Sequence, residues 1–234
     1  MKLAILLFGE YREFKYSIPS FSIFDEFKPD YYVSTWDISN DGFYKEEVTK
    51  EKIKKFLPNS DITLGEILIK PNGDEEEDNE KKIHYHWRTL VKRIEELGNQ
   101  YDGVILSRID LLLRKFNKSE FLKLNKENII YIEGGDGGSG GISDNFMYGS
   151  QSSIFKFINE IPHETMPSHI GIYKSMKKSG INISESDSFI SVNIIRSNMR
   201  NIVLNDNFFE SSRYSDIYYD FVLKREDMDS KLVK

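Results

Sequence analysis

Short apolar runs alternate with amphipathic segments through the first 110 residues, and this alternation constrains the fold more than any other feature. The runs lie at 2–8, 31–35, 62–69 and 103–106. Each is short and bounded by turn-forming residues, as buried strands are. The segments between them are expected to be helices and lie at 14–24, 46–57 and 84–97. A strand–helix repeat of this kind predicts an α/β fold with a mostly parallel central sheet and helices on both faces.

The pattern changes after Asp110. We expect a short helix or turn at 118–124 and strands at 129–132 and within 143–150. Helices are expected at 152–160, 169–179 and 185–198, followed by a strand at 201–204. The residues from Asp206 onward are aromatic without a clear period, and we expect them to pack back on the domain. The sequence therefore predicts one domain over residues 1–205 and a C-terminal tail over 206–234.

The composition excludes several classes of function. With 234 residues, of which 39% are hydrophobic, the chain is able to bury a sizeable core. A net charge of −6 gives no electrostatic reason to bind nucleic acid. The chain has no cysteine, which excludes disulfides, zinc–thiolate sites and cysteine nucleophiles and fits a cytoplasmic protein. No run approaches the roughly 20 apolar residues that span a bilayer, and the N-terminal run is expected to be a strand, not a signal peptide.

Charged side chains stand where the fourth apolar run ends. Arg108 and Asp110 follow the run 103–106 within the stretch YDGVILSRIDLLL. Ligands of open α/β sheets bind at the carboxyl ends of the strands, so this pair is a candidate binding site. An Arg-x-Asp pair is also a common structural ion pair, and both interpretations stay open here.

The segment EGGDGGSGG at 133–141 contains six glycines in nine residues. The segment is neither a phosphate-binding P-loop nor a dinucleotide fingerprint. It is either a flexible surface loop or a loop that closes over a substrate, in which glycine allows a hinge and a close backbone approach. Asp144 follows directly and is either a catalytic carboxylate or the cap of a turn ahead of Phe146.

Four motifs occur in a characteristic order: LLFGEYREF at 6–14, DYYVSTWD at 30–37, YDGVILSRIDLLL at 101–113 and SDNFMYGS at 143–150. In this order they resemble the GT-A class of nucleotide-sugar-dependent glycosyltransferases, and within it a group of small bacterial and viral glycosyltransferase-like proteins. The resemblance covers roughly residues 1–160. It implies a single GT-A-like, Rossmann-related domain in which 1–110 bind the nucleotide and 111–205 face the acceptor.

The resemblance also implies an activity, the transfer of a sugar from a nucleotide diphosphosugar to a glycan or small-molecule acceptor. Asp144 would be the catalytic base, and Asp110 would act beside the diphosphate. Residues implied to contact the nucleotide sugar are Gly9, Tyr11, Arg12, Asp37, Ser107 and Arg108. Residues implied to form an acceptor loop are Gly135, Asp136, Gly137 and Gly138. Arg12 is equally explained as a surface residue, and Asp37 as a strand-end cap.

A divalent cation, Mn²⁺ or Mg²⁺, is a further implication of the resemblance. The class holds this cation with an Asp-x-Asp triplet, whose first aspartate is replaced here by Arg108. Asp110 would remain as a ligand, with His169 as a second candidate. One carboxylate makes a weak site, whereas Arg108 is able to offer its own charge to the diphosphate as a fork. Dependence on a metal stays open at this point.

Two other functions fit parts of the sequence. The altered triplet favours a non-catalytic carbohydrate- or nucleotide-binding protein that has kept the fold. A sugar nucleotidyltransferase shares a similar sheet but needs a glycine-rich, basic phosphate loop after the first strand. Here that position has Gly9 alone and no lysine before Lys15.

Overall fold

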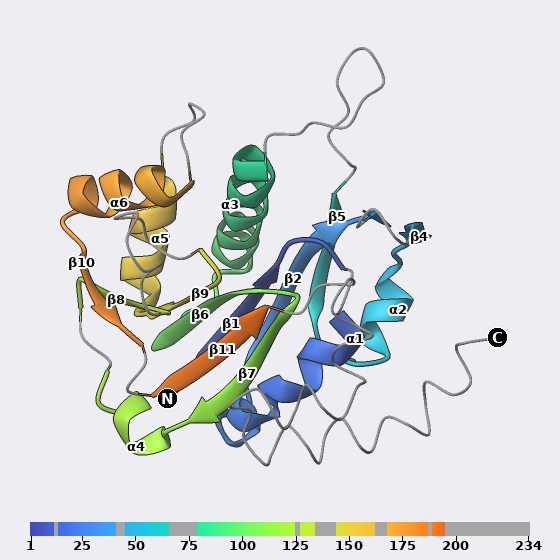
Figure 1. Ribbon diagram of the computed structural model, residues 1–234, viewed down its shortest axis with the longest axis horizontal. Helices are drawn as coiled ribbons and strands as arrows, with labels where there is room; N and C mark the ends of the chain where they lie inside the picture. Colours follow the sequence, from blue (N-terminus) through green and yellow to red (C-terminus); the bar gives the residue numbers. More distant parts are fainter. Residues whose placement is uncertain are drawn as a thin grey trace, which may run out of the picture.

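A seven-stranded sheet forms the centre of the protein, in the order β10-β8-β9-β6-β1-β2-β5 (Figure 1). The computed structural model describes residues 1–11, 14–40, 45–65, 79–124, 127–133, 144–161, 168–186 and 189–194. The strands of the sheet are β1 (Leu3–Phe8), β2 (Asp30–Trp36), β5 (Asp61–Gly65), β6 (Gly103–Arg108), β8 (Ile129–Ile132), β9 (Phe146–Gly149) and β10 (Asn182–Glu185). Four of the six pairings are parallel, and only those of β9 with β6 and β8 are antiparallel. The mostly parallel sheet is thus confirmed.

Helices cover both faces of this sheet, as expected (Figure 1). One face carries α1 (Phe14–Ser17), the 3-10 helix η1 (Ile18–Phe27) and α2 (Lys50–Lys54). The other carries α3 (Asn79–Leu97), α5 (Gln151–Asn159) and α6 (Ser168–Ser179). None of the helices among the described residues is long and apolar enough to cross a membrane.

The central strand β1 is buried on both sides, which explains its unbroken apolar sequence. Leu3, Ile5 and Leu7 pack in the core beneath α1, η1 and α2. The alternate residues Ala4, Leu6 and Phe8 pack beneath α3, α5 and α6. Because successive side chains of a strand point to opposite faces, a strand between two helical layers has to be apolar throughout.

The predictions of two helices are wrong over part of their length. The helix expected at 46–57 begins only at Lys50, because Thr49 caps it by accepting a hydrogen bond from the Lys52 N–H (3.3 Å). Its first residues instead form β4 (Lys45–Glu47), which pairs antiparallel with β3 (Ile38–Asn40). Tertiary pairing has here overridden the helical composition of the segment.

The described part of the helix expected at 185–198 consists of strands instead, and residues 195–198 lie outside the described residues. Residues up to Glu185 complete β10, and β11 (Ile190–Ile194) pairs antiparallel with β7 (Leu111–Phe116). The sequence ISVNI alternates apolar and polar residues, which is the strand period that the helical prediction overlooked. A short helix, α4 (Lys118–Phe121), follows β7. The strand expected at 201–204 and the tail 206–234 lie outside the described residues.

The order of the strands reverses direction at β1. From β1 the chain moves outward to β2 and then β5, and α3 carries it back to β6 on the other side of β1. The connections that follow the carboxyl ends of the neighbouring strands β1 and β6 therefore run in opposite directions. Such a topological switch point is where open α/β sheets bind their ligands.

Candidate functional site

Three strands end together at the switch point. Phe8 of β1 is paired with Arg108 of β6 and with Ser34 of β2. Backbone hydrogen bonds join the residues that follow, because the Ile109 N–H donates to the Phe8 carbonyl (2.8 Å) and the Gly9 N–H donates to the Ser34 carbonyl (3.2 Å). The ends of the strands are thereby held in fixed relative positions.

Gly9 is required at the end of β1 by its backbone conformation. Its φ angle is +108°, and a Cβ added there would meet nothing within 4 Å. Space is thus available, but a side chain is disfavoured at this φ. This geometry makes a sharp turn after the first strand, whereas the contact of Gly9 with a nucleotide stays a prediction.

Arg108 and Asp110 form a two-pronged ion pair at the end of β6. Nε of Arg108 donates to Oδ1 of Asp110 (2.8 Å), and Nη2 donates to Oδ2 (2.9 Å). The side chain of Asp110 is 3% exposed and that of Arg108 is 21% exposed. The ion pair is therefore present, and the part of it that reaches the surface belongs mainly to the guanidinium.

Negative charges surround this guanidinium. Burial lowers the pKa of Arg108, but the hydrogen bonds and the charge of Asp110 outweigh burial, and the charges of Asp144 and Glu10 add to them. The pKa is raised as a result, so Arg108 is always charged. Asp144 and Glu10 thus lie close enough to Arg108 to act on it electrostatically, although they are far from each other in sequence.

Asp144 reaches this position because β9 pairs antiparallel with β6. The Arg108 N–H donates to the Asn145 carbonyl (2.9 Å), which brings the residue before Asn145 to the end of β6. Asp144 is half-buried, and no described residue donates a hydrogen bond to its carboxylate. The expected alternative, an aspartate that caps its own turn, is thus not seen among these residues.

The residues that flank the glycine-rich segment are joined beside Arg108. The Glu133 N–H donates to the Phe146 carbonyl (3.3 Å), and Nδ2 of Asn145 donates to Oε2 of Glu133 (3.1 Å). Both ends of the segment 134–143 therefore start from the candidate site. The candidate acceptor residues of this segment lie outside the described residues: Gly135, Asp136, Gly137 and Gly138.

Tyr11 and Ser107 are core residues. The Tyr11 ring packs on Phe14 with 5.3 Å between ring centroids. Burial, with a smaller effect of the Glu46 charge, raises the pKa of Tyr11 to about 12. Ser107 is fully buried, and its hydroxyl donates to the Arg108 carbonyl (3.2 Å). Their contact with a nucleotide stays a prediction, and Arg12 lies outside the described residues.

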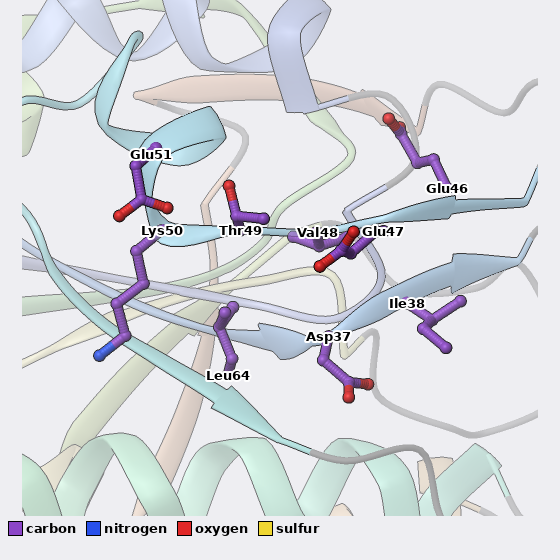
Figure 2. Close-up of a pocket in the computed structure, with 9 residues that line it drawn as sticks. All are labelled: Asp37, Ile38, Glu46, Glu47, Val48, Thr49, Lys50, Glu51 and Leu64. Carbon is purple, nitrogen blue, oxygen red and sulfur yellow. The ribbon is translucent and has the colours of Figure 1, made fainter.

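A groove of about 680 Å³ lies beside the ends of β2 and β5 (Figure 2). Its lining is Asp37, Ile38, Glu46, Glu47, Val48, Thr49, Lys50, Glu51 and Leu64. The Asp37 backbone is fixed, since its N–H donates to the Gly65 carbonyl (2.9 Å) and its carbonyl accepts from the Val48 N–H (2.7 Å). Its Oδ1 is buried without a hydrogen-bond partner in the described part of the chain. This oxygen of Asp37 therefore does not cap the strand end among the described residues, and the contact of Asp37 with a ribose stays a prediction.

Sequence reasoning missed a polar pair next to Gly9. The Ser34 hydroxyl and Nδ1 of His86 are 2.8 Å apart. His86 is 1% exposed, and this burial lowers its pKa to about 3, so the ring is neutral near pH 7. Its other nitrogen, Nε2, has no hydrogen-bond partner among the described residues. The two residues are 52 positions apart, and no local pattern signals such a pair.

The described side chains contain no cluster of metal ligands. Among them, no group of three or more histidine, aspartate or glutamate residues is arranged to hold a metal ion. Both carboxylate oxygens of Asp110 accept hydrogen bonds from Arg108. His169 belongs to α6, but its side chain is outside the described part of the structure.

Comparison with known proteins finds similarity at the level of structure. No family model and no curated protein matches the sequence. The apo-form glycosyltransferase GlyE of Streptococcus pneumoniae TIGR4 is 14% identical with a TM-score of 0.40, over 80% of this chain and 46% of GlyE. A glycosyltransferase involved in the glycosylation of the major capsid of PBCV-1 is 11% identical with a TM-score of 0.43, over 79% of this chain and 82% of that chain.

Both of these proteins are glycosyltransferases, the class that the sequence motifs resemble. The present chain spans about half the length of GlyE.

Proposed function

We propose that the protein is a glycosyltransferase that moves a sugar from a nucleotide diphosphosugar to a hydroxyl group of a glycan or small acceptor. The observation that carries this proposal is the meeting of Arg108 and Asp144 at the β1–β6 switch point. A guanidinium fork suits a diphosphate. A carboxylate to which no described residue donates a hydrogen bond suits a base that takes a proton from an acceptor hydroxyl.

The donor would lie along the carboxyl edge of the sheet. Its nucleoside fits at the end of β2, where Asp37 lines the groove and its carboxylate suits a ribose hydroxyl. The turn at Gly9 allows the backbone to approach the ligand closely. The diphosphate would then meet Arg108, and the sugar would face Asp144.

The chemistry requires two groups of opposite character. The bond between the anomeric carbon and the diphosphate oxygen breaks while the acceptor oxygen bonds to that carbon, through an oxocarbenium-like state. Asp144 takes the proton of the acceptor hydroxyl. The departing diphosphate gains negative charge, which Arg108 stabilises because its own charge is fixed in place before the reaction. A divalent cation, if bound, would also neutralise this charge.

One observation favours the second candidate, a non-catalytic carbohydrate- or nucleotide-binding protein. Asp110 is almost fully buried in an ion pair, which departs from the open Asp-x-Asp triplet that the resemblance implies. A sugar nucleotidyltransferase is less well supported, since Gly9 is the only glycine in the motif that follows β1.

Turnover and binding assays together separate these functions. The full chain is incubated with a panel of UDP-, GDP- and other nucleotide sugars, and release of the nucleoside diphosphate is measured with and without acceptors. We expect release from one donor class. Nucleotide binding by calorimetry without turnover of any donor would favour the non-catalytic binding protein. The absence of both turnover and nucleotide binding would overturn the proposal that the protein is a glycosyltransferase.

A further inference from the structure

We infer that Arg108, held in position by Asp110, binds the diphosphate of the donor in place of a divalent metal ion. This inference rests on the proposed function, because it requires a nucleotide diphosphosugar at the β1–β6 switch point. It assigns to Asp110 the role of a positioning residue for a guanidinium, whereas the sequence resemblance implied a metal ligand.

The carboxylate of Asp110 is poorly suited to ligate Mn²⁺ or Mg²⁺. Such cations bind oxygen atoms of carboxylates. Both oxygens of Asp110 already accept hydrogen bonds from Arg108, at 2.8 and 2.9 Å, in a side chain that is 3% exposed. The position of the missing first carboxylate is taken by Arg108 itself, whose positive charge repels a divalent cation.

The guanidinium of Arg108 keeps one edge for a ligand. A guanidinium has five N–H donors. Asp110 accepts one hydrogen bond from Nε and one from Nη2. No described residue accepts a hydrogen bond from the remaining N–H groups of Nη1 and Nη2. These remaining donors form the fork that binds two phosphate oxygens at once. The side chain of Arg108 is 21% exposed, so part of it is accessible to a ligand.

A second ion pair with the same geometry has a different exposure pattern. Arg93 also donates two-pronged hydrogen bonds to a carboxylate, with Nε 3.2 Å from Oδ1 and Nη2 2.9 Å from Oδ2 of Asp61. There the arginine and the aspartate side chains are 40% and 28% exposed. At the switch point, in contrast, the carboxylate is buried and only the arginine reaches the surface, as an arginine positioned for a ligand requires.

The charges of Asp144 and Glu10 act in the opposite direction. Both are negative, so they disfavour an anion and favour a cation near Arg108. Their effect on the Arg108 pKa is smaller than that of the directly bonded Asp110. Direct hydrogen bonds from a charged guanidinium to phosphate are strong contacts, and we infer that they dominate the binding of the donor.

The experiment measures nucleotide binding rather than activity. The full chain is titrated with UDP and with GDP by calorimetry, in EDTA and in excess Mn²⁺. We expect the preferred nucleotide to bind with the same Kd in both conditions. Arg108→Lys, which keeps the charge but loses the fork, is expected to weaken binding by about 10-fold or more. Arg93→Lys is the matched control and is expected to bind normally.

Asp110→Asn tests the positioning role directly. This variant keeps one acceptor oxygen but loses the charge that orients the fork, so we expect weaker nucleotide binding in EDTA. Binding of free Mn²⁺, followed by electron paramagnetic resonance in the presence of the nucleotide, is expected to be the same in wild type and Asp110→Asn. Asp61→Asn serves as the control for a lost ion pair, and circular dichroism verifies that each variant is folded.

The outcomes separate this inference from the proposed function. Nucleotide binding that appears only with Mn²⁺, or Mn²⁺ binding that Asp110→Asn abolishes, would overturn the inference and leave the glycosyltransferase standing. Failure of every nucleotide to bind wild-type protein in both conditions would overturn both. Equal binding in EDTA and Mn²⁺, lost in Arg108→Lys and kept in Arg93→Lys, supports the inference.

Discussion

The backbone N–H of Arg108 donates to the carbonyl of Asn145 at 2.9 Å. This bond extends the antiparallel pairing of β6 with β9 by one position, and it brings Asp144 to the end of β6, where its charge acts on Arg108. A positive group for a leaving diphosphate and a negative group for an acceptor proton are thus brought together by one strand pairing.

Asp144→Asn is expected to lower turnover by about 10²–10⁴-fold, the usual contribution of a general base. Nucleotide binding is expected to be kept or strengthened, because the variant removes a negative charge that acts on Arg108. The free energy of unfolding is expected to change little, because no described residue donates a hydrogen bond to this carboxylate. Steady-state kinetics, calorimetry and urea unfolding measure the three quantities. Glu95→Gln, on the exposed side of α3, is the control. Full activity in Asp144→Asn would exclude Asp144 as the base.

Gly9→Ala is expected to destabilise the fold by about 1–2 kcal/mol, because an alanine at positive φ is strained. Gly98, after α3, also has a positive φ (+66°) and open space for a Cβ, so Gly98→Ala is a matched control for stability. Urea unfolding should show a loss in both variants, at least as large in Gly9→Ala, whose φ lies farther from the left-handed helical value. Only Gly9→Ala is expected to weaken nucleotide binding as well, and equal binding by both variants would argue against a ligand at Gly9.

The buried ring of His86 is expected to make stability depend on pH. Burial lowers its folded-state pKa to about 3, below the unfolded value near 6.5. Between these values the unfolded chain binds the extra proton. The free energy of unfolding therefore falls as pH is lowered through this window, with a slope of up to about 1.4 kcal/mol per pH unit from this group.

The contribution of His86 is isolated by comparison with a variant. Urea unfolding of wild type and His86→Gln is measured from pH 4 to pH 7. The difference in stability between the two proteins is expected to change with pH, because all other titrating groups are shared. A difference that stays constant across this range would show that His86 titrates normally in the folded protein.

Gly65→Ala is expected to disturb the aromatic stack at the end of β5. A Cβ there would lie 2.9 Å from the Trp36 ring and 3.0 Å from the Tyr85 ring. These rings stack with 5.2 Å between centroids, and displacing them is expected to cost about 1–3 kcal/mol. Tryptophan fluorescence and urea unfolding measure the effect. Wild-type stability in this variant would mean that the rings move apart without cost.

Much of the secondary structure was predictable because it follows from the local periodicity of apolar residues. The run at 129–132 is a strand with the bounds expected, and α6 begins one residue before the expected 169. The helix expected at 185–198 failed because the alternation in ISVNI becomes decisive only when β7 is there to pair with it. Local composition supports several structures for such a segment, and the partner strand selects one of them.

The candidate site, too, was predictable from the sequence only in part. The sequence by itself determined that Arg108 and Asp110 follow a buried strand and that Asp144 follows the glycine-rich segment, since these are statements about neighbours in the chain. Only the tertiary structure decided that β9 lies beside β6, that both oxygens of Asp110 face Arg108, and that His86 meets Ser34 across 52 residues. Contacts between distant segments depend on the packing of the whole sheet and its helices, and no short window of sequence contains that information.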